Sequence, residues 1–177
     1  MFQMSELPTT IQTATAAQIS IHSPIGTIAI EGTARGVSSI RFVESGIGRQ
    51  QQPLKLLPMP IRTCAIQLEE YFAGKRQEFF LKLDMFGTEF EQRVWQEVMH
   101  IPFGETRSYG EIAGVLGDAK VVRAVGQANA HNPFMIVVPC HRVVAHDGAL
   151  VGYAAGLHRK RWLLDHEAKA SGARLAL

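Results

Sequence analysis

The sequence predicts an α+β fold: a small antiparallel sheet with one helix, followed by a mostly helical part that holds a winged-helix-like helix-turn-helix. Three observations support this prediction. Apolar and polar residues alternate over 18–43, helical spacing dominates after residue 85, and glycine or proline separates the segments. The change of character near residue 85 divides the chain into an N-terminal α/β domain, 1–85, and a C-terminal domain, 86–177.

The N-terminal sheet is predicted from short alternating segments with turns between them. Residues 18–23 alternate, residues 24–26 supply a turn, and residues 27–31 alternate again before a second turn bounded by glycines. A third alternating segment covers 37–43. This succession is typical of an antiparallel meander.

One helix should complete the first domain. A stretch rich in glutamine and proline runs to Pro60 and is expected to be an exposed connection. Beyond it the residues at helical spacing are apolar, namely Ile61, Ala65, Leu68 and Phe72. Gly74 then ends the helix. Cys64 lies within this pattern, which predicts a core position for its thiol.

Capping residues mark the first helices of the second part. Thr88 with Glu91, and Ser108 with Glu111, form the S/T-x-x-E pattern that satisfies free N–H groups at a helix start. The first pair precedes a helix with apolar residues at regular spacing, which are Phe90, Val94, Trp95 and Val98.

The helix-turn-helix is predicted from two short helices over 109–116 and 120–130. Gly117 and Asp118 interrupt the chain between them. This pattern is common and by itself weak. A last helix is expected over 158–169.

The composition is that of an ordinary globular protein. Of 177 residues, 46% are hydrophobic and 19% charged, which excludes intrinsic disorder, and the net charge of +2 leaves room only for a local basic patch. Two cysteines are too few for a disulfide framework, and no spacing of Cys or His predicts a metal site. With no signal-peptide pattern and no run of about 20 apolar residues, a cytoplasmic protein without a membrane partner is expected.

The residues around Cys140 carry the chemical prediction. An apolar run ends at Pro139, and Cys140 is followed at once by His141 and Arg142. Thiolate is the reactive form of cysteine, and basic or cationic neighbours favour it. A helical turn opened by Pro139 would add free N–H groups. From this pattern alone, an inert core cysteine is as good an interpretation as a catalytic one.

Several separated motifs give the sequence a resemblance to a known family. Residues 139–143, Pro-Cys-His-Arg-Val, are similar to the active-site motif of the O6-alkylguanine-DNA alkyltransferases. Further matching segments follow the family's order along 90–167: Arg123-Ala124-Val125-Gly126, Asn132-Pro133, Gly152-Tyr153-Ala154, the run from Arg159 to Leu164, and His166-Glu167. The chain as a whole most resembles the bacterial stand-alone members, with a weaker match in the N-terminal domain.

The resemblance implies direct reversal of DNA damage. Cys140 would accept a methyl or larger alkyl group from O6 of guanine, and from O4 of thymine, in a stoichiometric transfer. Glu167 would act through His141 and a water molecule to withdraw the thiol proton. No cofactor is implied, because the damaged DNA is the alkyl donor. The residues alone leave open a solvated carboxylate at Glu167 and an ordinary core or surface histidine at His141.

The resemblance also implies roles around the reacting base. Tyr109 would give its phenol proton to the leaving base, and Asn132 would tie the helix-turn-helix to the loop before the cysteine. Main-chain groups of Cys140 and Val143 would read the guanine edge. Packing at a helix start is the alternative for the tyrosine, and a turn before proline is the alternative for the asparagine.

The remaining roles implied by the resemblance concern DNA and the pocket wall. The partner would be double-stranded DNA with a flipped alkylated base, bound through its minor groove by a monomer, with cooperativity left open. Arg123 would fill the vacated base stack. Small residues would let the helix approach DNA or merely pack tightly; they are Ala124, Gly126 and Ala128. Tyr153 would form a wall of the pocket, and the N–H of Ala154 would point at O6.

Three positions depart from the family pattern. Ala154 stands where some relatives have serine, so a hydroxyl is absent but the main-chain donor remains. His131 stands where many have glycine or serine, and a bulky side chain there could alter the loop. Ala155 replaces a common glycine and is expected to narrow the pocket.

Two other functional classes compete with this interpretation. A Cys-His hydrolase usually takes its thiol and imidazole from distant parts of the chain, and it would regenerate the thiol in each cycle. Here the two residues are adjacent. A DNA-binding module without chemistry would bind alkylated DNA and gain no methyl group, and family members of that kind replace the cysteine.

Overall fold

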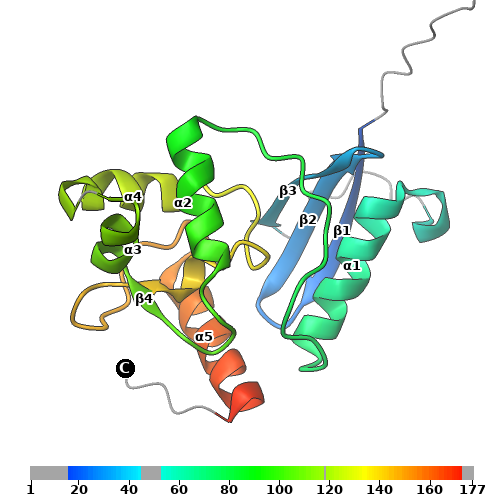
Figure 1. Cartoon of the computed structure of the whole chain (residues 1–177). Coiled ribbons are helices and arrows are strands. Elements are labelled where there is room, and N and C mark those ends of the chain that lie inside the picture. The colour runs from blue at the N-terminus through cyan, green and yellow to red at the C-terminus, as the bar shows by residue number, and fades with distance from the viewer. Residues whose placement is uncertain (1–15, 45–52, 118, 173–177) are drawn as a thin grey trace, which may run out of the picture.

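The computed structural model describes residues 16–44, 53–117 and 119–172. In this part of the chain, a three-stranded antiparallel sheet with a helix beside it is followed by a group of helices with a two-stranded parallel ladder (Figure 1). The predicted α+β class is therefore confirmed.

The sheet consists of β1 (Ala17–Ser23), β2 (Gly26–Thr33) and β3 (Gly36–Val43), paired in sequence order. Alternate residues of a strand share a face, so the register brings the apolar side chains of neighbouring strands into rows. One row is Ile19, Ile30 and Ile40, and the next is Ile21, Ile28 and Phe42. All of them lie in the core or pack against it.

The helix α1 (Met59–Phe72) packs against all three strands. Its buried side includes Ile61, Leu68 and Cys64, whose thiol is 0% exposed. The core position predicted for Cys64 is therefore confirmed, and burial raises its pKa to about 12, which keeps the thiol protonated.

Two boundaries differ from the prediction. β2 continues past residue 31 to Thr33, because a bulge between Glu31 and Gly32 lets the ladder with β3 resume. α1 begins at Met59, so Pro60 lies inside the first turn of the helix, whereas the prediction placed Pro60 in the connection before it. Proline is tolerated there because the first N–H groups of a helix have no partner within the helix.

The first two helices of the second part begin as predicted, whereas the third starts at Val122, after a 3-10 turn over Ala119–Val121. α2 (Glu89–Met99) and α3 (Tyr109–Val115) both start at complete capping boxes, in which the hydroxyl and the carboxylate each accept a backbone N–H. α4 (Val122–Ala130) packs against both helices. The pair α3 and α4 is the predicted helix-turn-helix.

The two parts of the molecule meet along the outer edge of β3. Residues 82–84 run parallel to it at Val37. The loop 133–139 pairs with it at Ile40, whose N–H donates to the Pro133 carbonyl (2.7 Å) and whose carbonyl accepts from the Met135 N–H (3.0 Å). The edge is thus covered, and the loop that leads to Cys140 is fixed to the N-terminal sheet.

Three elements follow that loop in the sequence: a 3-10 turn, a short strand and the last helix. A single 3-10 turn, η3 (Cys140–Arg142), leads into β5 (Val143–Val144), which pairs in parallel with β4 (Arg107–Ser108). α5 (Leu157–Ser171) packs against η3. Within the described ranges, we find no helix with the length and hydropathy needed to cross a bilayer.

Candidate active site

Cys140 lies at the start of η3, directly after Pro139, and is 4% exposed. It lines a cavity of about 280 Å³. The cavity brings together many of the residues singled out in the sequence: Tyr109, Gly126, Asn132, Tyr153 and Ala154. Asn129, Ala130, Met135 and Gly152 complete its lining.

The thiol of Cys140 is protonated in the free protein. Burial raises its pKa to about 11, although the Asn132 amide and the Lys160 ammonium act in the opposite direction. The helical turn expected after Pro139 is present but consists of only three residues. Activation of the thiol therefore needs a base close to it.

The loop before Cys140 contains a strained residue, and the Asn132 side chain binds the loop backbone at two points. Ile136, a buried β-branched residue, has a φ of 75°, a conformation that costs about 1–3 kcal/mol. The Asn132 amide donates to the Val138 carbonyl (2.8 Å), and its Oδ1 accepts from the Phe134 N–H (2.9 Å). These bonds join the end of α4 to the loop, the contact expected of this asparagine.

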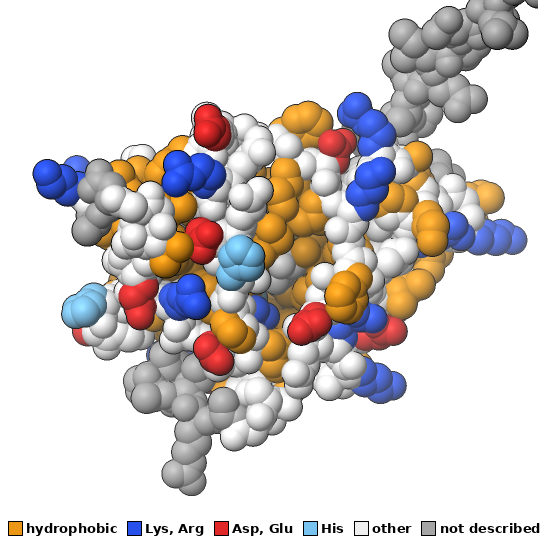
Figure 2. Space-filling view, in the orientation of Figure 1, with side chains coloured by type: hydrophobic (Ala, Val, Ile, Leu, Met, Phe, Trp, Pro, Cys, Tyr) orange, Lys and Arg blue, Asp and Glu red, His pale blue; other side chains and the backbone are white. Residues whose placement is uncertain are grey.

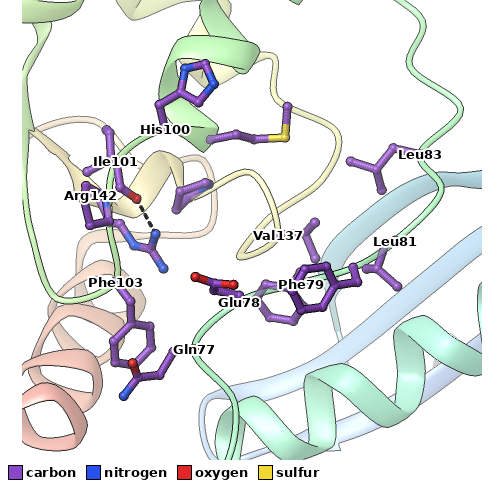
Figure 3. Close-up of a pocket in the computed structure, with 14 residues that line it drawn as sticks. Gln77, Glu78, Phe79, Leu81, Leu83, His100, Ile101, Phe103, Val137 and Arg142 are labelled. Atoms are coloured by element: carbon purple, nitrogen blue, oxygen red, sulfur yellow. Dashed lines mark hydrogen bonds between the residues drawn. The ribbon is translucent and has the colours of Figure 1, made fainter.

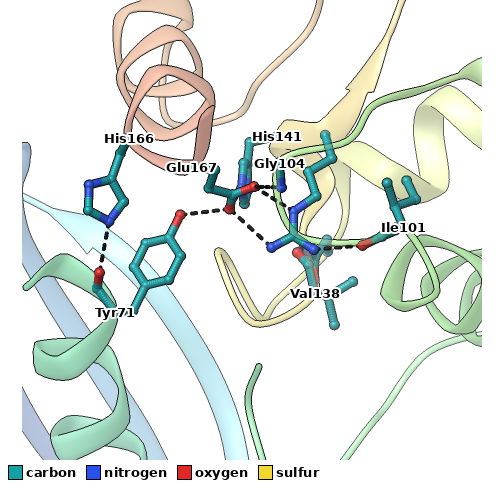
Figure 4. A network of polar contacts seen from close by, with 9 residues as sticks. Tyr71, Ile101, Gly104, Val138, His141, His166 and Glu167 are labelled. Atoms are coloured by element: carbon teal, nitrogen blue, oxygen red, sulfur yellow. Dashed lines mark hydrogen bonds and ion pairs between the residues drawn. The ribbon is translucent and has the colours of Figure 1, made fainter. Parts of the chain in front are cut away.

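His141 is buried against Glu167. Its Nε2 lies 2.7 Å from Glu167 Oε1, and both side chains are 0% exposed (Figure 4). An ionised carboxylate only accepts hydrogen bonds, so Nε2 carries the hydrogen and Nδ1 keeps its lone pair. Burial lowers the pKa of His141 despite the attraction of Glu167. Among the described residues, Nδ1 has no hydrogen-bond partner.

Glu167 is the centre of a larger polar network. Arg142 donates from Nε to Oε2 (2.9 Å) and from Nη2 to Oε1 (3.0 Å), the Tyr71 hydroxyl donates to Oε1 (2.8 Å), and the Gly104 N–H donates to Oε2 (3.1 Å). Burial alone would raise the pKa of Glu167, but His141 and Arg142 outweigh it and hold the pKa well below its ordinary value. The buried carboxylate is therefore ionised.

Gly104 is required by this network. Its φ is 79°, in the left-handed region that favours glycine, and a Cβ atom there would lie 2.6 Å from Ser171 Oγ. Glycine at position 104 therefore lets the backbone bring its N–H to Glu167 without strain. Neither Gly104 nor Tyr71 was identified from the sequence.

Lys160 is a further site residue that the sequence analysis missed. Its ammonium is completely buried and donates to the carbonyls of Val143 (2.5 Å), Val151 (2.7 Å) and Gly152 (3.5 Å). Burial lowers its pKa to about 8, and Cys140 opposes the shift. Lys160 thereby ties β5 to the loop that carries Tyr153. In the sequence, Lys160 stands three and four residues before Leu163 and Leu164, a helical spacing that would have indicated a buried position.

The residues expected to face DNA separate into two groups. Arg123 is exposed on α4, and Ala124 is half-buried. Gly126 lies beside Tyr109, whose ring carbons would be 4.0 Å from a Cβ atom placed on that glycine. Ala128, by contrast, is 2% exposed, and its carbonyl accepts from the Trp95 indole (2.8 Å). Ala128 therefore belongs to the core between α2 and α4, and we remove it from the DNA-facing set.

Val143 is also completely buried and is not among the residues that line the cavity. Its N–H donates to the Cys140 carbonyl, and its own carbonyl is engaged by Lys160. Any contact of Val143 with a base would therefore use the second lone pair of that carbonyl.

The structure places two of the departures from the family pattern outside the cavity. His131 is exposed, and its Nδ1 lies 2.8 Å from Glu91 Oε1, so it links the end of α4 to the capping box of α2. Ala155 does not line the cavity, and its carbonyl accepts from Arg159 (2.7 Å). Any narrowing of the pocket by Ala155 would therefore act through its neighbour Ala154, which does line the cavity.

A second cavity of about 600 Å³ lies between the two parts of the molecule (Figure 3). Val137, Pro139 and Arg142 line it together with Phe79 and Phe103, and the Phe103 ring centre lies 5.7 Å from the Arg142 guanidinium carbon. Figure 2 shows hydrophobic side chains in the hollow between these parts. Cys140 does not line this larger cavity, so the chemistry is assigned to the smaller one. Within the described ranges, no cluster of Cys, His, Asp and Glu could hold a metal.

The site predicts a loss of stability in acid. His141 and Glu167 both have pKa values below those of the unfolded chain, 6.5 and 4.5, so the unfolded state binds each proton first as pH falls. The free energy of unfolding should therefore be steady near neutral pH, decline below about 6.5 and fall further below about 4.5. Urea midpoints measured from pH 3.5 to 8 test this, and a midpoint that does not change over that range would contradict it.

Comparison with known proteins identifies the family. Residues 18–85 match the ribonuclease-like domain, and residues 89–169 the DNA binding domain, of 6-O-methylguanine DNA methyltransferase. The chain is 44% identical over 158 residues to the methylated-DNA–protein-cysteine methyltransferase of Mycobacterium tuberculosis, covering 89% of this chain and 96% of the relative. It is 45% identical over 149 residues to that of Methanosarcina barkeri, covering 83% and 94%.

Solved structures agree with this result. Mycobacterium tuberculosis OGT in complex with DNA aligns with a TM-score of 0.75 at 44% identity, covering 85% of this chain and 92% of that one. The O6-methylguanine methyltransferase of the same organism also aligns with a TM-score of 0.75, at 40% identity, covering 92% and 97%. The chain belongs to the methylated-DNA–protein-cysteine methyltransferase family.

Proposed function

We propose that this protein repairs DNA by direct reversal, moving a methyl or larger alkyl group from O6 of guanine to its own Cys140, once per molecule. One observation carries the proposal. Cys140 lines a cavity of about 280 Å³, and the next residue of the same turn, His141, has its Nε2 2.7 Å from Oε1 of the buried Glu167. A nucleophile, a base and an orienting carboxylate are thus present in one place.

The reaction is an in-line displacement. The thiol proton of Cys140 passes through a water molecule to Nδ1 of His141, the nitrogen left free by the bond to Glu167. The sulfur then forms a bond to the alkyl carbon as the bond from that carbon to O6 breaks, and the electron pair stays on the guanine. The imidazolium is stabilised by the ionised Glu167, which the pair with Arg142 keeps negative.

Tyr109 supplies the proton that the departing guanine needs. Burial raises the pKa of its phenol, so the hydroxyl remains protonated and can donate. The residue lines the cavity together with Cys140, and its hydroxyl lies 3.6 Å from where a Cβ of Gly152 would be.

The DNA complex that fits this site uses α4 in the minor groove. A base inside a duplex cannot reach the cavity, so the alkylated nucleotide is flipped out of the stack. The exposed Arg123 enters the vacated stack, and the small residues Ala124 and Gly126 allow close approach. Tyr153 walls the cavity, the Ala154 N–H points at O6, and main-chain groups of Cys140 and Val143 read the guanine edge. The protein acts as a monomer in the cytoplasm and also accepts O4-alkylthymine.

The decisive experiment is peptide-resolved mass spectrometry after incubation with a duplex containing one O6-methylguanine. We expect a gain of one methyl group, about 14 Da, on Cys140 with a one-to-one endpoint. A matched Cys140→Ser variant should bind the duplex and gain nothing. Binding by the wild type without a mass gain would indicate a recognition module, and repeated turnover with a free thiol would indicate a hydrolase.

A further inference from the structure

We propose that Tyr71, from the N-terminal domain, is a positioning residue of the proton relay, and that its hydroxyl sets how strongly Glu167 holds His141. This inference rests on the proposed alkyl transfer. It gives the N-terminal domain a direct part in the chemistry, although Cys140, His141 and Glu167 all belong to the C-terminal part.

The geometry places Tyr71 in competition with His141 for one oxygen atom. Glu167 Oε1 accepts from the Tyr71 hydroxyl (2.8 Å), lies 2.7 Å from Nε2 of His141, and accepts from Nη2 of Arg142 (3.0 Å). A carboxylate oxygen has two lone pairs, so three donors share its charge. The hydrogen bond from Tyr71 therefore weakens the one that Glu167 makes with His141.

Tyr71 is held in place for this contact. Its side chain is 0% exposed on α1, and its ring meets Phe103 edge-on at 6.2 Å. Its carbonyl lies 2.8 Å from Nε2 of His166, the residue before Glu167 on α5 (Figure 4). The helices α1 and α5 are thus joined by two contacts of Tyr71, one through its carbonyl and one through its hydroxyl.

The other groups that face the pair remain when the hydroxyl is removed. Arg142 and the Gly104 N–H still bind the carboxylate. The positive charge of Lys160, on α5, still lowers the pKa values of His141 and Cys140. The remaining neighbour is Tyr153, whose pKa is raised far above the range of the experiment mainly by burial. Loss of the hydroxyl therefore concentrates the charge of Glu167 on His141, which raises the pKa of the imidazole.

The test is the pH profile of single-turnover methyl transfer from pH 5 to 8, in the full-length chain. For Tyr71→Phe we expect the acidic limb to move up by about one pH unit, the scale set by one hydrogen bond to a charged group. The matched control is Ile61→Val on the same helix, which loosens the same core without touching Glu167. Its profile should coincide with that of the wild type.

A second variant works in the opposite direction and preserves packing. Replacing Tyr71 by 3-fluorotyrosine makes the hydroxyl a stronger donor, so the acidic limb should move to lower pH. Unchanged limbs in both variants would overturn the positioning role, as would equal shifts in Tyr71→Phe and Ile61→Val. If the wild type itself transfers no methyl group, the proposed function fails rather than the role of Tyr71.

Discussion

Replacing Glu167 by glutamine should slow methyl transfer by about 10²–10⁴-fold and lower the free energy of unfolding by about 3–5 kcal/mol. The change removes the negative charge while keeping the shape of the side chain. The Arg142 guanidinium, only 6% exposed, then loses its buried counterion. His141 loses the group that fixes its tautomer and stabilises its protonated form.

Both effects of Glu167→Gln can be measured on one preparation. Urea unfolding followed by circular dichroism gives the free energy, and rapid quenching at saturating DNA gives the rate of transfer. The control is Asp165→Asn, a half-buried position on the same helix, which should change both quantities little. A Glu167→Gln protein with wild-type transfer would remove the carboxylate from the mechanism, whatever its stability.

Replacing Lys160 by methionine should be the next most damaging change. The unbranched side chain fills a similar volume, but the carbonyls of Val143, Val151 and Gly152 lose a buried donor. An unsatisfied buried carbonyl costs about 1–3 kcal/mol. The contact with Val143 is buried and those with Val151 and Gly152 are partly buried, so we expect a loss of about 2–5 kcal/mol in unfolding free energy. The loop that carries Tyr153 and Ala154 loses its anchor, so a higher concentration of damaged DNA should be needed for half-saturation.

Lys160→Met should also make the thiol less reactive. The ammonium lowers the pKa of Cys140, so its removal should slow the reaction with iodoacetamide at pH 7, where a lysine with a pKa of about 8 is still charged. Lys169→Met, at an exposed position on the same helix, is the matched control and should resemble the wild type. Wild-type stability and thiol reactivity in Lys160→Met would show that the three carbonyl contacts contribute little.

The sequence determined the elements of this fold because their signals are local. Alternation along each strand over 18–43 predicted the sheet. Two S/T-x-x-E pairs, whose contacts join residues three positions apart, predicted the starts of α2 and α3. The short parallel pair β4–β5 was not predicted, because two-residue strands leave no periodic pattern. The division at residue 85 stays a prediction.

The sequence also identified the residues around Cys140, mainly through the family motif. Tyr109, Asn132 and Tyr153 do gather with Cys140 around one cavity, and His141 does pair with Glu167. The prediction that Ala128 faces DNA was wrong because a small residue on a helix fits a core as well as a DNA surface. The pattern of residues on α4 could not decide which side of that helix is covered by α2.

Tertiary structure alone decided what surrounds the charges. Lys160 and Glu167 share the buried side of α5 with Leu163 and Leu164, at spacings of three, four and seven residues. Such spacing shows that both charges face inward, but it does not name their partners. Those partners come from α1, from Gly104 and from the loop at 151–152. Because buried charges are stable only where distant groups satisfy them, the chain had to fold before Tyr71 could meet Glu167.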